Sequence, residues 1–240
     1  MPDMENLITD LIAAHRAGTR FEPEIRPLER SEILKIQSAV CDTLGAVTGF
    51  KVGAQPDGPP VLAPMMSAYS VKNGGTRKVA DRLGIELEVG FELLRELPGD
   101  ALPDNPQDYF HPCVMLELVD TRLTGPAATD PGYKFADFQL NAGSVKGDSL
   151  TTWNGSDFGA LEARLTAGNE TILDGPCTVP GGSALANLDL LLRHLGSHCG
   201  GLQPGQIAIT GSLCGLPYFG PGTEIHGSIN GIGAVAVTLA

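Results

Sequence analysis

The sequence has 240 residues and a formal net charge of −12, from 28 acidic side chains against 16 lysines and arginines. This charge argues against a nucleic acid or an anionic membrane as a partner, because either would need a basic patch to displace counterions or to meet lipid headgroups. Glycine (31 residues) and proline (18 residues) are abundant, so we expect a turn-rich chain with more strand than long helix.

The hydrophobic content of 42% is that of a folded domain rather than a disordered chain. No apolar run approaches the ~20 residues of a membrane-spanning helix, and the N-terminus lacks the basic start and apolar block of a secretory signal. The five cysteines are odd in number and widely spaced, without a Cys-x-x-Cys pair. We therefore expect reduced thiols in a cytoplasmic protein.

Helical periodicity dominates the first fifth of the chain. Apolar residues recur at helical spacing over 4–17 and again over 31–44, where Ser31 is the expected N-cap and Gly45 ends the pattern. We therefore divide the chain into a helical N-terminal segment, 1–45, and a β-rich domain, 46–240.

From residue 46 onward the period changes to two, which is typical of strands. The predicted strands are 47–52, 85–93, 114–119, 161–165, 171–173, 207–209, 224–229 and 234–239. A turn at 167–169 suggests a hairpin between the fourth and fifth of these strands. One later helix is well marked, because Ser183 can cap it, leucines repeat over 185–195 and Gly196 follows.

Paired carboxylates lie on the predicted strand 85–93. Alternation sends its apolar side chains to one face and Glu86, Glu88 and Glu92 to the other. Two carboxylates two residues apart therefore lie side by side. The alternative is a solvated outer face of a half-buried strand.

A third glutamate, Glu117, lies on a strand that is apolar on both faces. Such a strand is normally buried on both sides, and a buried carboxylate is costly unless it is paired or bound to a metal. If Glu86 and Glu88 lie nearby, three carboxylates favour a hard divalent ion, Mg²⁺ or Mn²⁺. The alternative for Glu117 is a buried ion pair with an arginine or lysine.

Lys51 lies inside an apolar strand, with Gly49 and Gly53 two residues to either side. Glycines at these positions let a ligand or another backbone approach closely. Such a lysine can be a general acid or base, or a fixed cation for a substrate carboxylate. The alternative is a lysine that snorkels from the end of a strand.

Six motifs follow one another along the chain: Gly-x-Lys-Val-Gly at 49–53, Glu-x-Glu at 86–88, Glu117 on its strand, Thr-Gly-Ser at 210–212, Pro-Gly-Thr at 221–223 and Gly-Ile-Gly at 231–233. Their order resembles the hydratase and decarboxylase branch of the fumarylacetoacetate hydrolase superfamily over nearly the whole chain. The resemblance implies an α+β, β-rich fold, with a mixed β-sheet roll or sandwich as the catalytic domain and a helical N-terminal segment.

The resemblance also implies a metal site and its chemistry. Glu86, Glu88 and Glu117 would hold Mg²⁺ or Mn²⁺, which would chelate a small 2-oxo or 2-hydroxy carboxylic acid. Lys51 would shuttle protons or orient this substrate. Asp57 matches an aspartate of a Gln-Pro-Asp loop that would activate water, although the loop is shorter here and Gly-Pro-Pro follows it.

Three further positions, Asn141, Thr210 and Ser212, match substrate-binding positions in the resemblance. Leu140 stands where the family commonly has aspartate. The resemblance implies a lyase, namely a hydratase that adds water to a 2-hydroxy-2,4-dienoate to give a 4-hydroxy-2-oxo acid. It places this reaction in aromatic meta-cleavage catabolism and implies a homo-oligomeric enzyme. The alternatives are decarboxylation of a 2-oxo-3-enedioate, carbon-carbon bond hydrolysis of an acylpyruvate, and an inactive relative that binds a keto acid.

Overall fold

The computed structural model describes residues 4–240, with four α-helices and thirteen strands among them. The helices are α1 (Met4–Ala17), α2 (Arg30–Leu44), α3 (Pro131–Ala136) and α4 (Ala184–Leu195). The strands are β1 (Val47–Gly53), β2 (Val61–Met66), β3 (Val71–Lys72), β4 (Gly75–Arg77), β5 (Leu83–Leu93), β6 (Phe110–Val119), β7 (Asn141–Ser149), β8 (Ala160–Ala167), β9 (Glu170–Thr178), β10 (Ile207–Ser212), β11 (Tyr218–Phe219), β12 (Glu224–Ile229) and β13 (Gly233–Leu239).

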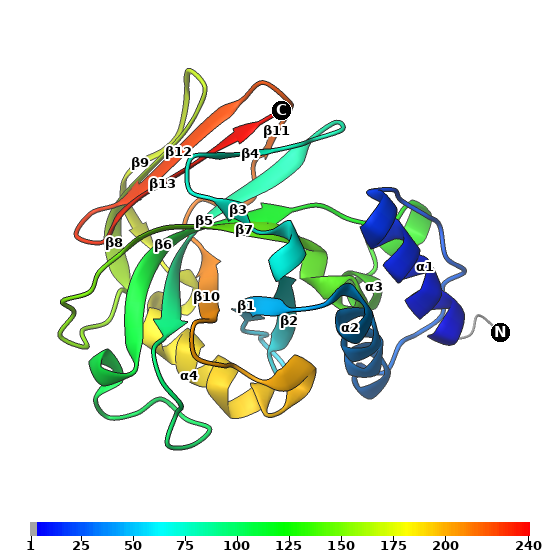
Figure 1. Cartoon of the computed structure of the whole chain (residues 1–240), viewed down its shortest axis with the longest axis horizontal. Helices are drawn as coiled ribbons and strands as arrows, with labels where there is room; N and C mark the ends of the chain where they lie inside the picture. Colours follow the sequence, from blue (N-terminus) through cyan, green and yellow to red (C-terminus); the bar gives the residue numbers. More distant parts are fainter. Residues whose placement is uncertain (1–3) are drawn as a thin grey trace.

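Two mixed sheets form the β-rich part of the molecule (Figure 1). The larger has the order β2-β1-β10-β5-β6-β7-β3, with β11 added beside β5, and the smaller has the order β4-β13-β12-β8-β9. β1 pairs with β10 in parallel, whereas β10, β5, β6 and β7 pair antiparallel in turn. The fold is therefore α+β and β-rich, as predicted.

The main hydrophobic core lies between the two sheets and α4. Alternation along β5 directs Leu87 into this core, where Leu87 and Leu116 lie against Gly227 of the smaller sheet. Phe50 and Val52 of β1 belong to the same core. Because side chains alternate along a strand, Lys51 and Glu88, which are next to these core residues in the sequence, face the other side of the larger sheet.

The N-terminal helices have a core of their own. α1 and α2 pack with α3, with residues of β2 and with the turn after α3, and Figure 1 shows them at one end of the molecule. None of the helices within residues 4–240 has both the length and the apolar character to cross a membrane. The division into a helical segment and a β-rich domain stays a prediction.

Most predicted elements are present, with one cap corrected. Ser183 accepts a hydrogen bond from Ala186 N and caps α4, and all five cysteines are free thiols. The prediction of Ser31 as the N-cap of α2 was wrong. The Glu29 carbonyl accepts from Ile33 N, so the helix begins at Arg30 and Ser31 lies within its first turn.

The two glycines that flank Lys51 are predicted to respond very differently to substitution. A Cβ at Gly49 would lie 1.9 Å from the Ile207 carbonyl oxygen on β10, whereas a Cβ at Gly53 meets nothing within 4 Å. Gly49→Ala should therefore cost about 2–3 kcal/mol of unfolding free energy, because β1 has to move away from β10. Gly53→Ala on the same strand is the control and should change little. Urea unfolding of both variants measures the difference, and equal effects would contradict this interpretation.

Candidate metal and active site

Strand pairing brings the three predicted glutamates together. Glu86 on β5 lies directly opposite Glu117 on β6, and Glu88 lies two residues farther along β5 on the same face. One carboxylate oxygen from each of the three lies within 4.8 Å of the others. Glu117 and Glu88 are buried, with 0% and 2% of their surface exposed, and Glu86 is partly exposed. The solvated strand face considered as an alternative is therefore not what the structure shows.

Glu117 is held by two neighbours through one of its oxygens. Its Oε1 accepts from Lys51 Nζ at 2.6 Å and from Asn141 Nδ2 at 2.9 Å. Its Oε2 is fully buried and has no hydrogen-bond partner among the described residues. A buried oxygen of this kind is costly, so the arrangement leaves a ligand position that a cation would satisfy. The ion pair with a lysine, which the sequence left open for Glu117, is present together with the cluster.

A break in the pairing of β10 with β5 orients Glu88. The register shifts between Ile209 and Ser212, and Gly211 has φ +115°, a conformation that favours glycine. This bulge directs Gly211 N toward Glu88 Oε2, at 2.6 Å. Asn187 of α4 donates to the Thr210 carbonyl at 2.9 Å and so fixes the bulge. Bulges often redirect groups in this way beside functional sites.

A left-handed turn positions a second acceptor for Lys51. Phe138, Gln139 and Leu140 have φ values of +52°, +49° and +65°, a conformation that is uncommon for residues other than glycine. The Gln139 carbonyl accepts from Lys51 Nζ at 3.2 Å. Sequence reasoning missed this contact, because a backbone acceptor leaves no side-chain signal.

The cluster carries an excess of negative charge. Burial raises the pKa of Glu86 to about 7, with a contribution from the Glu117 carboxylate. Burial also raises the pKa of Glu88 well above its ordinary value, together with Glu117 and Glu86. For Lys51, burial lowers the pKa, but the three carboxylates outweigh this effect and hold it above its ordinary value. One ammonium faces three carboxylates, so full ionisation leaves two negative charges.

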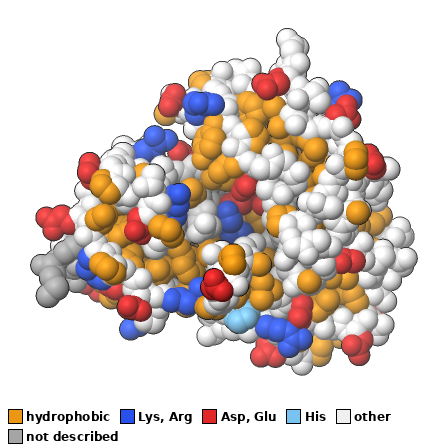
Figure 2. Space-filling view, turned by 180° about the vertical axis from the view of Figure 1, so that it is seen from behind, with side chains coloured by type: hydrophobic (Ala, Val, Ile, Leu, Met, Phe, Trp, Pro, Cys, Tyr) orange, Lys and Arg blue, Asp and Glu red, His pale blue; other side chains and the backbone are white. Residues whose placement is uncertain are grey.

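These residues fit a hard divalent cation. The donor set consists of carboxylate oxygens, which Mg²⁺ and Mn²⁺ prefer. The two surplus negative charges of the cluster match the charge of such an ion, and the unpartnered Glu117 Oε2 offers a free lone pair. Figure 2 shows a hollow near the centre of one face of the molecule, with acidic and basic side chains beside each other inside it.

The remaining predicted site residues differ in their distance from the cluster. Ser212 lies opposite Glu88 where β10 pairs with β5, and its hydroxyl donates to the Gly215 carbonyl at 2.6 Å. Thr210 is buried, and its hydroxyl donates to the Val89 carbonyl. Asp57 lies in the exposed loop between β1 and β2 and makes no hydrogen bond or ion pair within residues 4–240. The roles assigned to all of these residues stay predictions.

Comparisons with known proteins bear on the fold. No protein-family model and no curated protein sequence matches the chain. Among solved structures, 4-oxalocrotonate decarboxylase from Pseudomonas putida G7, complexed with magnesium and adipate, is 17% identical, with a TM-score of 0.81 over 99% of this chain and 97% of that chain. The same enzyme complexed with calcium and acetate gives a TM-score of 0.78 at 16% identity, over 100% and 99% of the two chains.

A third solved structure is similar over a smaller share of the chain. It is 5-carboxymethyl-2-hydroxymuconate delta-isomerase from Mycobacterium smegmatis, which is 15% identical, with a TM-score of 0.59 over 81% of this chain and 80% of that chain. These similarities confirm the resemblance predicted from the motifs at the level of the fold. The chain thus shares the fold of these solved structures.

Proposed function

We propose that this protein is a divalent-metal-dependent enzyme that acts on a small 2-oxo or 2-hydroxy carboxylic acid. The observation that carries the proposal is the buried group of Glu86, Glu88 and Glu117 beside Lys51. Two of the similar structures were solved with a divalent metal and a small carboxylate, which supports this class of ligand. Mg²⁺ or Mn²⁺ is the ion that we propose.

The chain's own residues would prepare the substrate. The bound ion would supply Lewis-acid stabilisation of the charge that develops on the C2 oxygen of the substrate. Lys51 Nζ carries three hydrogens, and two of them go to Glu117 Oε1 and the Gln139 carbonyl. The third is left to donate to a substrate oxygen or to deliver a proton. Asn141 would keep Glu117 in place through its amide.

Within this class, we propose decarboxylation of a 2-oxo-3-enedioate as the first candidate. The bond to the distal carboxylate breaks, its electron pair moves through the conjugated system to the C2 oxygen, and carbon dioxide leaves. No base is needed to generate a water nucleophile. The exposed position of Asp57 favours this reaction over hydration, and the similarity to a decarboxylase over both full chains agrees with it.

Hydration of a 2-hydroxy-2,4-dienoate is the second candidate, favoured by the Gln-Pro-Asp sequence at 55–57. It uses the same chelation, but it requires Asp57 or Lys51 to activate water. We further propose that the enzyme works as a homo-oligomer in the cytoplasm. The free thiols support that compartment, and the homo-oligomer rests on the family resemblance.

Two substrates distinguish these reactions. The purified protein with Mg²⁺ is incubated with 2-oxohex-3-enedioate, and carbon dioxide release is measured together with ultraviolet absorbance. In parallel, it is incubated with 2-hydroxypenta-2,4-dienoate, whose absorbance disappears on hydration. We expect carbon dioxide release that stops when the metal is removed. Hydration alone would select the hydratase. If neither substrate turns over, incubation with an acylpyruvate follows: its cleavage would select the hydrolase, and binding without turnover would indicate an inactive relative.

Metal affinity should depend on pH. The pKa of Glu86 is raised to about 7 by burial and by Glu117, so below that pH a proton occupies a carboxylate that the metal needs. The proton must leave before the ion binds, and Mg²⁺ affinity should therefore rise with pH, by up to about tenfold per pH unit for each displaced proton. Calorimetric titration with Mg²⁺ at pH 6, 7 and 8 measures this rise. An affinity that is the same at all three values would contradict it.

A further inference from the structure

A cavity of about 860 Å³ lies between α1, the segment that joins β4 to β5, and the segment after β6. Its lining includes neither the three glutamates nor Lys51. Leu83 and Asp120, which line it, lie three residues along the chain from Glu86 and Glu117, about 10 Å at the rise of a strand. The cavity is therefore close to the glutamate cluster and separate from it.

Cationic side chains are concentrated in this cavity. Five of the 16 lysines and arginines of the chain line it, namely Arg20, Arg77, Lys78, Arg82 and Arg122. The chain as a whole has a net charge of −12, so a group of cations in one cavity is the opposite of what the net charge of the chain would suggest. A concave surface with a net positive charge concentrates anionic ligands.

Two of these cations are already compensated by acids. Arg122 is buried, and its Nε lies 2.6 Å from Asp137 Oδ1. Arg20 pairs with Asp120 at 2.7 Å. Arg82 donates to a backbone carbonyl, which carries no full charge. Asp81, an exposed acid, also lines the cavity. The five cations therefore face three acids, namely Asp81, Asp120 and Asp137, and the cavity keeps an excess of positive charge.

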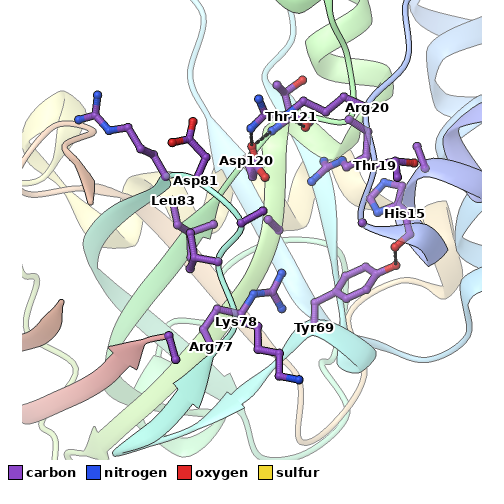
Figure 3. Close-up of a pocket in the computed structure, with 18 residues that line it drawn as sticks. His15, Thr19, Arg20, Tyr69, Arg77, Lys78, Asp81, Leu83, Asp120 and Thr121 are labelled. Carbon is purple, nitrogen blue, oxygen red and sulfur yellow. Dashed lines mark hydrogen bonds and ion pairs between the residues drawn. The ribbon is translucent and has the colours of Figure 1, made fainter. Parts of the chain in front are cut away.

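Arg77 is the central cation of the cavity that has no ion pair of its own, although the carboxylate of Asp120 partly offsets its charge. It is half-buried, and its guanidinium forms no hydrogen bond or ion pair within residues 4–240. Figure 3 shows its side chain extending into the space between Asp120 and Tyr69. Burial lowers the pKa of Arg77, which reflects the cost of removing an unpaired cation from water. The neighbouring Lys78 is exposed and also makes no side-chain hydrogen bond or ion pair in the described part of the chain.

We propose that this cavity is a second ligand site, which binds a small organic dianion through Arg77 and Lys78. A guanidinium pairs bidentately with a carboxylate or with a phosphate group, so dicarboxylates and phosphate esters share the required chemistry. Ala14, Val79 and Ala142 add apolar wall for the body of such a molecule. The volume lies within the range of small-molecule sites. The proposal does not depend on the metal-dependent activity.

Calorimetric titration of the full chain, freed of metal with a chelating resin, tests the proposal with succinate and with inorganic phosphate as probes. We expect saturable binding of at least one probe, and the tighter of the two identifies a carboxylate or a phosphate ligand. Arg77→Gln should weaken this binding by about tenfold or more. Lys78→Gln, an exposed change that leaves folding intact, should weaken it by a smaller factor. Arg164→Gln, an exposed arginine on β8 outside the cavity, is the matched control and should have no effect.

Three results would overturn the proposal. The first is the absence of saturable binding of either probe to the unaltered protein. The second is equal binding by the Arg77→Gln, Lys78→Gln and Arg164→Gln variants. The third is loss of binding in Lys51→Met, because the probe would then pair with the ammonium beside the glutamate cluster. Failure of the enzymatic assays with intact probe binding would refute the proposed function alone.

Discussion

Replacement of Glu117 by glutamine is expected to weaken Mg²⁺ binding by about 100-fold or more and to abolish metal-dependent turnover. Glutamine keeps the volume and can still accept from Lys51 and Asn141, which now share Oε1 of the carboxylate. What it removes is the charge and the unpartnered Oε2. Since Glu86 and Glu88 still face Lys51, the ammonium keeps charge compensation, and the metal-free variant should remain folded.

Glu92→Gln is the matched control for this change. Glu92 lies on the same strand, β5, but its carboxylate pairs with Lys146 at 2.7 Å and is not one of the clustered glutamates. Titration calorimetry with Mg²⁺ and thermal unfolding with and without the ion should distinguish the two variants. Unchanged Mg²⁺ affinity in Glu117→Gln would eliminate the three-glutamate site.

Replacement of Lys51 by methionine is expected to lower turnover by about 10²–10⁴-fold, the usual contribution of a positioned acid or base. Methionine fills a similar volume but donates no hydrogen bond to Glu117 or to the Gln139 carbonyl. The loss of a cation from a group of three carboxylates should at the same time leave Mg²⁺ affinity equal or higher. A variant that binds metal well and turns over poorly is therefore the expected result.

Lys72→Met serves as the control, because Lys72 is an exposed lysine on β3. Steady-state rates and Mg²⁺ titrations on both variants provide the comparison. Full turnover in Lys51→Met would remove its catalytic role, whereas loss of Mg²⁺ affinity together with turnover would mean that Lys51 acts by organising the glutamates.

Periodicity and alternation predicted much of the fold. The spacing of leucines and the cap at Ser183 located α4, and alternation placed Glu86 and Glu88 on the face opposite Leu87. The register of an antiparallel pair then put Glu117 opposite Glu86. The sequence predicted the helix and the alternation because each depends on a local pattern. The proximity of Glu117 to Glu86 was only a condition in the sequence analysis, and the pairing of β5 with β6 supplies it.

Other features depend on contacts that local patterns do not encode. β7 carries glycine, serine and lysine, which are weak strand formers, and its pairing with β6 defines it as a strand. The pairing of Lys51 with Glu117 joins strands separated in the sheet by β10 and β5. The cavity that we propose as a dianion site combines residues from six separate stretches of the chain, and Arg20, Arg77 and Arg122 come from three of them.

A crystal structure with Mn²⁺ in place of Mg²⁺ would locate the proposed metal site, because anomalous scattering identifies manganese independently of the protein atoms. We expect one strong anomalous peak among the carboxylates of Glu86, Glu88 and Glu117, with Glu117 Oε2 as a ligand. A fully occupied manganese elsewhere, or three carboxylates without a peak at saturating Mn²⁺, would contradict it.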